Sequence, residues 1–285
     1  MDPRGQHAHA PHDRVAGGKA LQDLPCLREG PVMAKPWNAL ILAAGRGPDD
    51  PMAKAYGVAN KCTIPIAGKP MLLRVAEALE TSGVIGPIAV SIEDPGIVSA
   101  LLGDRALALT PAHSAPASVM AALGSGKLTY PVLVTTGDHA LLTPDMVRHF
   151  CAESAAIDAD FTAGLATAET ILAAYPDSIR TYFTLGPDRV SGCNLFAVKN
   201  ARALSLLDRW QYLEQVRKKP WRLIAAFGIS PLLRFLTGRL DLEQAFQIVS
   251  ARLGLLARPV VMPFAEAAID VDKPADKELA ERIAA

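Results

Sequence analysis

ALILAAGRGPDDPMAKAYGVANKCTIPIAGKPMLL, residues 39–73, joins a short apolar run, a turn with two glycines, a lysine and a second glycine turn in one block. Ala39 to Ala44 are all apolar and are followed by Gly45. A run this short that ends at a glycine is typical of a central strand buried on both faces of a sheet. The block therefore predicts a strand that delivers the chain to a glycine turn.

The glycine turn has the features of a phosphate-binding loop. Gly45 and Gly47 let the backbone turn sharply and bring N–H groups close to an anion, with no Cβ in the way. Arg46 and Lys61 supply positive charge. An ordinary strand-to-helix turn with incidental glycines is the alternative interpretation, because a short glycine motif is weakly specific by itself.

The second half of the block, KCTIPIAGKPML from Lys61 to Leu72, resembles the signature of nucleotidyltransferases with a GT-A-like Rossmann fold, and in particular the MobA-like NTP transferase family. The resemblance implies a three-layer α/β/α fold around a mostly parallel sheet. It also implies that Lys61 is catalytic. The residues that it places at the nucleotide are Ala43, Ala44, Gly45, Arg46, Gly47 and Lys61.

The chain departs from the family pattern in the loop between the two halves. Residues 48–60 are longer than the family's usual loop and lack its arginine, so either Lys54 substitutes for it or the site is closed differently. The family's proline–lysine pair is matched by Asn60 and Lys61, so the lysine keeps its assignment.

Composition agrees with an enzyme domain. The chain has 285 residues, 50% of them hydrophobic, which is enough to bury a large core as one domain with an elaboration or as two small domains. Basic and acidic residues balance at 29 each, so nothing favours nucleic-acid binding. The four cysteines lack the spacing of a zinc site or a disulfide framework, and we expect a cytoplasmic protein.

The organisation predicted along the chain is a disordered N-terminal tail over residues 1–36 and a nucleotidyltransferase domain over 37–285, with a C-terminal helical elaboration at about 201–255. No apolar run is long enough to span a membrane. Strands and helices alternate after residue 38, as in a parallel sheet covered by helices. The predicted strands are 39–44, 87–92, 106–110 and 130–135, and the predicted helices are 71–81 and 114–123.

Asp138 follows the last of these strands in TTGDHALLTPDMV. Because ligands gather beyond the carboxyl ends of parallel strands, Gly45 and Asp138 are expected in one crevice. The segment resembles the one in which the family binds magnesium through an aspartate. Mg²⁺ prefers carboxylate oxygen and offsets triphosphate charge, so we predict a catalytic, metal-binding role. The alternative is that Asp138 caps the helix at Thr143 or stabilises a turn.

A second metal ligand is expected near the end of the chain, in AIDVDKPAD. This segment looks like the family element in which a strand returns an acidic residue to the metal. Alternation along a strand puts Asp270 and Asp272 on one side, and the metal role falls on Asp272. Both aspartates facing solvent before a helix is the competing interpretation.

Three further residues are predicted to bind substrate. Arg180 offers a guanidinium fork to an acceptor phosphate, although a surface salt bridge explains it as well. Asn194, on the second strand of an expected hairpin over 178–200, is positioned to bond an acceptor hydroxyl or to hold a turn. Ser118 matches the family position that contacts the base, or it caps its own helix.

The helical elaboration carries an apolar surface edged with positive charge. Leu232, Leu233, Phe235 and Leu236 lie beside Arg234 and Arg239. Peripheral contact with a bilayer and a homodimer interface are both consistent with this pattern, as is a helical subdomain with its own core.

Together these features predict a Mg²⁺-dependent nucleotidyltransferase that moves NMP from an NTP, with CTP or GTP favoured, to a phosphorylated sugar or alcohol and releases pyrophosphate. A molybdenum-cofactor guanylyl- or cytidylyltransferase is an alternative within the family. A nucleotide-sugar glycosyltransferase and a non-catalytic nucleotide-binding regulator are alternatives of other classes.

Overall fold

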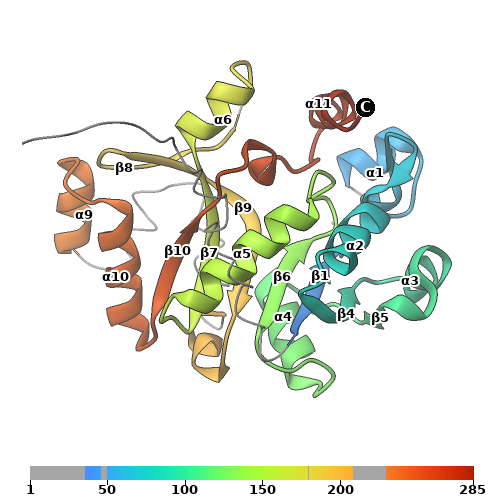
Figure 1. Cartoon of the computed structure of the whole chain (residues 1–285), viewed down its shortest axis with the longest axis horizontal. Helices are drawn as coiled ribbons and strands as arrows, with labels where there is room; N and C mark the ends of the chain where they lie inside the picture. The colour runs from blue at the N-terminus through green and yellow to red at the C-terminus, as the bar shows by residue number, and fades with distance from the viewer. Residues whose placement is uncertain (1–35, 46–49, 179, 208–228) are drawn as a thin grey trace, which may run out of the picture. The chain divides into compact units, whose positions relative to one another are not determined.

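A mixed β-sheet forms the centre of the computed structural model (Figure 1). The structure describes residues 36–45, 50–178, 180–207 and 229–285. Almost all of the predicted tail, together with Arg46 and Gly47, lies outside the described residues.

Within the described residues the main sheet has eight strands, in the order β10-β7-β9-β6-β1-β4-β5, with β8 paired to β9 off this path. The strands are β1 (Trp37–Leu42), β4 (Ile85–Ser91), β5 (Leu107–Leu109), β6 (Val132–Thr136), β7 (Phe161–Thr167), β8 (Phe183–Leu185), β9 (Asp188–Val198) and β10 (Ala257–Val261). β1 pairs in parallel with β4 and β6, β4 with β5, and β7 with β10. β9 runs antiparallel to β6, β7 and β8, so the sheet is mostly parallel.

Helices cover both faces of the sheet and confirm the three-layer α/β/α prediction. The α-helices with described bounds are α1 (Pro51–Tyr56), α2 (Met71–Thr81), α3 (Pro95–Leu102), α4 (Ala115–Gly124), α5 (Pro144–Ala156), α6 (Ala168–Ala174), α9 (Ile229–Leu236), α10 (Leu242–Leu253) and α11 (Pro274–Ala284). Short 3₁₀ turns are η2 (Lys61–Thr63), η3 (Gly103–Arg105), η4 (Ala201–Ala203) and η5 (Ala265–Ala268), and a small hairpin pairs β2 (Pro65–Ile66) with β3 (Lys69–Pro70). None of the described helices combines the length and apolar character needed to cross a membrane.

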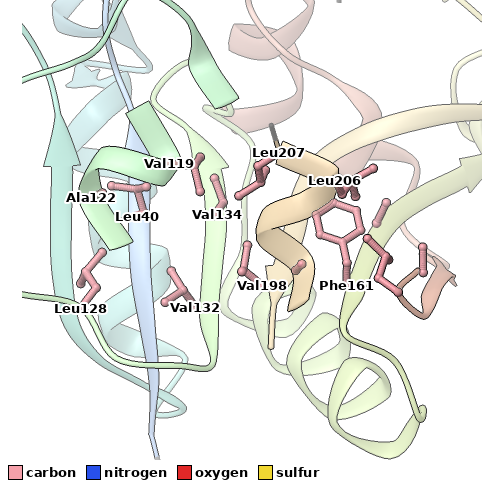
Figure 2. Close-up of a cluster of buried hydrophobic side chains, with 14 of the residues drawn as sticks. Leu40, Val119, Ala122, Leu128, Val132, Val134, Phe161, Val198, Leu206 and Leu207 are labelled. Atoms are coloured by element: carbon pink, nitrogen blue, oxygen red, sulfur yellow. The ribbon is translucent and has the colours of Figure 1, made fainter. Parts of the chain in front are cut away.

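The sheet core explains why β1 is central. Leu40 of β1 and Val134 of β6 point to the face covered by α4, where they pack with Val119 (Figure 2). On the same face α10 packs against this cluster through Phe246 and Val249. α2 and α5 pack against one another, so they form a second helical layer. Full burial of each large aliphatic side chain stabilises the fold by about 1.5–3 kcal/mol.

Local signals set where the helices begin. Asp94, Ser114 and Thr143 each accept a backbone N–H in the first turn of α3, α4 and α5. Each of these helices also has a proline at its first or second position, where a missing N–H costs nothing. Thr143 therefore caps α5, and the suggested capping of that helix by Asp138 is wrong.

The long loop after the glycine turn contains a short helix. Asp50 accepts hydrogen bonds from Met52 and Ala53 at the start of α1, and Gly57 ends the helix with a left-handed backbone. The described part of the loop over residues 48–60 therefore contains α1.

Helices α9 and α10 lie within the range predicted to be a helical elaboration, part of which falls outside the described residues. Leu233 and Leu236 of α9 are 56% and 65% exposed. Contact with a bilayer and self-association through this surface both stay predictions.

Candidate functional site

The carboxyl ends of β1, β4 and β6 are joined by backbone hydrogen bonds just beyond the sheet. Ala43 donates its N–H to the Ser91 carbonyl at 2.9 Å, and Gly137 donates to the Leu42 carbonyl at 2.8 Å. A Cβ on Gly137 would lie 2.8 Å from Cys62 Sγ and 3.0 Å from Ala43 Cβ. Only glycine therefore lets the segment before Asp138 approach the first glycine turn this closely.

Lys61 is carried into this edge by the 3₁₀ turn η2. Asn60 caps the turn, because its side-chain oxygen accepts the Cys62 N–H at 2.8 Å. The amide nitrogen of Asn60 donates to the Ala43 carbonyl at 2.8 Å. Asn60 thus ties the lysine-bearing turn to the glycine turn. Sequence reasoning noted Asn60 only as the neighbour of Lys61; an asparagine just before a short turn is the signal that identifies it as a cap.

Lys61 lies between two carboxylates. Its Nζ donates to Asp138 Oδ2 at 2.5 Å and to Asp272 Oδ1 at 2.6 Å. The side chains of Lys61 and Asp138 are 9% and 13% exposed, whereas that of Asp272 is 36% exposed. Burial by itself would lower the pKa of Lys61, but the charges and hydrogen bonds of the two aspartates outweigh it and raise this pKa above its ordinary value. The lysine is therefore a cation in the folded protein.

A backbone hydrogen bond brings Asp272 to Asp138. Val271 is fully buried and donates its N–H to the Asp138 carbonyl at 3.1 Å. The acidic residues on either side of Val271 diverge: Asp272 reaches Lys61, and Asp270 reaches Arg180. The segment is extended but is not a strand, since β10 ends at Val261 and η5 intervenes. The expected delivery of both aspartates by a strand is therefore wrong.

The two carboxylates fit a magnesium ion. Asp138 Oδ1 is buried and has no hydrogen-bond partner among the described residues, so this carboxylate oxygen is available as a metal ligand. The other oxygen, Oδ2, accepts the Lys61 ammonium. The described residues contain no cluster of three or more acidic, histidine or cysteine side chains that could hold a metal. Mg²⁺ is commonly bound through one or two carboxylates, with water and substrate phosphates as its other ligands. Asp138 and Asp272 suit that pattern.

His139, next to Asp138, is fully buried and stays neutral. Burial lowers its pKa to about 4, against the raising effect of the nearby Asp138 and Asp270 charges. Its Nδ1 is 3.4 Å from Thr135 Oγ1, which orients the ring. An imidazole is an uncommon magnesium ligand, so a structural role beside the metal site agrees with this burial.

A cleft of about 530 Å³ opens beside Lys61. It is lined by Gly45, Asp50, Ala53, Lys54, Gly57, Val58, Ala59, Asn60, Lys61 and Glu93. Its volume is in the range of small-molecule sites. Lys54, the residue suggested to replace the family's arginine, is therefore at the cleft.

Glu93 was not predicted to belong to the site. It lies two residues after the end of β4, and its carboxylate accepts the Gly45 N–H at 3.1 Å. An acidic residue just after a predicted parallel strand is the sequence signal that identifies it. The Gly45 N–H, which is expected to face phosphate, thus donates to a carboxylate oxygen in this structure.

The remaining residues of the turn differ in exposure. Ala43 is buried, with its N–H bonded to Ser91 and its carbonyl to Asn60. Ala44 is exposed at the start of the turn.

The hydroxyl of Ser118, in α4, already has hydrogen-bond partners within its own segment. It accepts the Ala112 N–H and donates to the Ser114 carbonyl, both at 2.9 Å. Ser114 caps α4. Ser118 therefore does not cap the helix, and it shapes the loop before α4. Contact with a nucleobase stays a prediction.

Arg180 and Asn194 form a second group around Asp270. Arg180 Nη1 donates to Asp270 Oδ1 at 2.7 Å, and Asn194 Nδ2 lies 3.4 Å from Asp270 Oδ2. The side chains of Arg180 and Asp270 are 11% and 28% exposed, so the salt bridge considered for Arg180 is present, but it is partly buried and does not lie at the surface.

A mostly parallel sheet whose carboxyl edge presents a glycine turn, a lysine and two aspartates is the construction of a nucleotidyltransferase. A family model, the MobA-like NTP transferase domain, matches residues 39–216, and the chain belongs to this family. A search of curated proteins found no match.

Solved structures agree with this assignment. A hypothetical transferase from Thermus thermophilus is 30% identical, with a TM-score of 0.72, covering 85% of this chain and 99% of that one. The 4-diphosphocytidyl-2C-methyl-D-erythritol synthase of Anaerococcus prevotii DSM 20548 is 12% identical (TM-score 0.53, 88% and 98% covered). A CMP:2-keto-3-deoxy-manno-octonic acid synthetase complexed with CTP is 14% identical (TM-score 0.54, 88% and 98% covered). The last two share the fold.

Proposed function

We propose that this chain transfers NMP from CTP or GTP to a phosphorylated sugar or alcohol in a Mg²⁺-dependent reaction that releases pyrophosphate. The observation that carries the proposal is the position of Lys61, between Asp138 and Asp272 and beside the cleft at the glycine turn. The buried lysine can balance charge on a triphosphate. The two carboxylates, which come from distant parts of the chain, can bind the metal ion that accompanies it.

The glycine turn and Lys61 bind and orient the nucleotide in this proposal. The Gly45 N–H faces an anionic oxygen, and Lys61 exchanges its carboxylate partners for phosphate oxygens when the triphosphate enters. Asp138 and Asp272 would hold magnesium, which would offset the negative charge of the phosphates. Such positioning and electrostatic stabilisation account for most of the catalysis in phosphoryl transfer.

The transfer itself is an in-line displacement. An oxygen of the acceptor phosphate bonds to the α-phosphorus, and the bond from that phosphorus to the bridging oxygen of pyrophosphate breaks, with the electron pair leaving on pyrophosphate. No covalent enzyme intermediate is required. Cys193 agrees with this, because burial raises its pKa to about 12, against the smaller lowering effects of the Ala166 backbone and Arg180.

We assign Arg180 and Asn194 to the acceptor, Ser118 to the base, and the reaction to the cytoplasm. The described cysteines support a reducing compartment, since Cys62, Cys151 and Cys193 are all free thiols.

Pyrophosphate release tests the proposal. The protein is assayed with each of the four NTPs against phosphorylated sugars, phosphorylated alcohols and molybdopterin. Release with CTP or GTP and a sugar or alcohol phosphate supports it; release only with molybdopterin identifies the cofactor-maturing alternative. No release with any pair, despite nucleotide binding, indicates a regulator or a glycosyltransferase.

Two variants test the site. We expect Asp138→Asn and Lys61→Ala each to slow pyrophosphate release by about 10²–10³-fold or more, as loss of a charge-stabilising group does. Circular dichroism checks that the fold is kept. A near-normal rate in either variant removes that residue from the mechanism.

A further inference from the structure

Arg180 is a nearly buried arginine that uses one side of its guanidinium only. It lies between α6 and β8, and its Nη1 donates to Asp270 Oδ1 at 2.7 Å. Its Nε and Nη2 are buried and have no hydrogen-bond partner in the described structure. A guanidinium has five N–H donors in a rigid plane, and buried donors are normally satisfied. The unpaired donors therefore require an explanation.

The two unpaired nitrogens form one edge of the guanidinium. Nε–H and one Nη2–H point in parallel, which is the geometry that binds two oxygens of a carboxylate or a phosphate together. Asp270 holds the opposite part of the group at Nη1 and fixes its plane. The Nε–Nη2 edge is thus buried but unpaired, and its two parallel donors have the geometry that binds an oxyanion.

Asn194 supports the same position through an unusual backbone. It has a positive φ of 49°, and the pairing of β7 with β9 shifts register between Ala163 and Leu165, opposite this part of β9. Irregularities of this kind redirect a side chain and are often found beside binding sites. Here the side-chain amide is directed to Asp270, on the other oxygen from Arg180.

The unpaired Nε–Nη2 edge is separate from the nucleotide cleft and close to Asp272, one of the two proposed metal ligands. Arg180 is not among the residues that line the cleft at the glycine turn. Its partner Asp270 is two residues from Asp272, a separation of about 6–7 Å along an extended chain. A small molecule at Arg180 can therefore extend to the carboxylate pair that holds Lys61.

We propose that the Nε–Nη2 edge of Arg180 is an oxyanion subsite that reads a carboxylate or phosphoryl group of the acceptor. The identification of its ligand as the acceptor rests on the proposed function, whereas the anion site itself does not. The preferred acceptors are thus molecules that carry such a group, and neutral alcohols are excluded.

Anion binding tests the subsite directly. Inorganic phosphate and acetate are titrated separately into the full chain, in EDTA and at low ionic strength, and the heat of binding is measured. We expect saturable binding of at least one anion, which distinguishes a phosphoryl from a carboxylate ligand. Arg180→Lys keeps the charge but loses the fork, and should weaken this binding at least tenfold. Arg189→Lys, at an exposed arginine of β9 in the hairpin that follows Arg180, is the matched control and should have no effect.

A second variant moves the affinity in the opposite direction. Asp270→Asn removes the charge that neutralises Arg180, so the bound anion should become at least threefold tighter and should raise the melting temperature more than in the wild type. This measurement decides the question if Arg180→Lys does not fold. Failure of both anions to bind, an unchanged affinity in Arg180→Lys, or no gain in Asp270→Asn would overturn the subsite.

Binding of CTP and GTP is measured on the same proteins. A protein that binds an anion through Arg180 but neither nucleotide keeps the subsite and loses the proposed function. A protein that binds a nucleotide but no anion through Arg180 keeps the proposed function and loses the subsite.

Discussion

Replacing Lys61 by methionine should make the empty site bind a divalent cation more tightly while it damages catalysis. In the folded protein the lysine ammonium occupies the position between Asp138 and Asp272. A metal ion that enters without nucleotide must therefore displace a buried cation from both of its carboxylate partners. Methionine has a similar length and no charge, so it removes this competition.

The size of the effect follows from the distances. Each carboxylate oxygen lies within 2.6 Å of the same Nζ, so the two oxygens are at most about 5 Å apart. Without the lysine, two negative charges at that separation repel by about 3 kcal/mol at an effective dielectric constant of 20. A metal ion that relieves this repulsion gains about a hundredfold in affinity. Solvent reduces this value because the Asp272 side chain is 36% exposed. We expect Mn²⁺ to bind Lys61→Met about tenfold more tightly than the wild type.

Electron paramagnetic resonance of free Mn²⁺ measures this affinity without nucleotide. Lys69→Met is the matched control, because Lys69 pairs with Glu77 at a more exposed position in the same segment. It should leave Mn²⁺ binding unchanged.

The expected signature is tighter Mn²⁺ binding together with slower pyrophosphate release. An equal or weaker Mn²⁺ affinity in Lys61→Met would refute the competition between lysine and metal. Loss of Mn²⁺ binding in the double variant Lys61→Met, Asp138→Asn would show that the gained affinity belongs to this site.

Two other predictions concern the structure around the site. His139 has a folded-state pKa of about 4, lowered by burial, against an ordinary value of 6.5, so the unfolded state binds more protons between these values. Stability should fall by up to about 3 kcal/mol as the pH drops from 6.5 to 4; urea unfolding should show this loss reduced in His139→Gln and retained in the exposed-residue control His113→Gln. Gly137→Ala forces a Cβ to 2.8 Å from Cys62 Sγ, so it should lower the free energy of unfolding by about 1–3 kcal/mol and weaken nucleotide binding. Gly124→Ala, in α4 with open space at its Cβ, should leave nucleotide binding unchanged and stability equal or slightly higher, and equal losses in the two glycine variants would contradict the close approach.

Much of the fold follows from local sequence patterns. The helix predicted over 71–81 is α2 with the same bounds, and the predicted strand over 39–44 is β1, shifted to Trp37–Leu42. The shift has a physical reason, since Ala43 belongs to the turn and gives its carbonyl to Asn60. Apolar periodicity and caps act over a few residues, so a sequence records them directly.

The register of the strands and the pairing of distant segments were harder to predict from the sequence. An antiparallel β9 between β6 and β7, and the register shift that accompanies the positive φ of Asn194, depend on which strands meet in space. The pairing of Arg180 with Asp270 joins residues 90 positions apart and was not foreseen. Such contacts have no local signal.

The sequence by itself determined the buried strand, the glycine turn, the identity of the charged residues and the resemblance to a nucleotidyltransferase family. Only the tertiary structure decided that Lys61 meets Asp138, 77 residues away, and Asp272, 211 residues away. The physical reason is that parallel strands end at one edge of the sheet, where backbone bonds from Gly137 and Val271 set the positions of the aspartates. The site is therefore a product of sheet order and backbone pairing, which no short stretch of sequence contains.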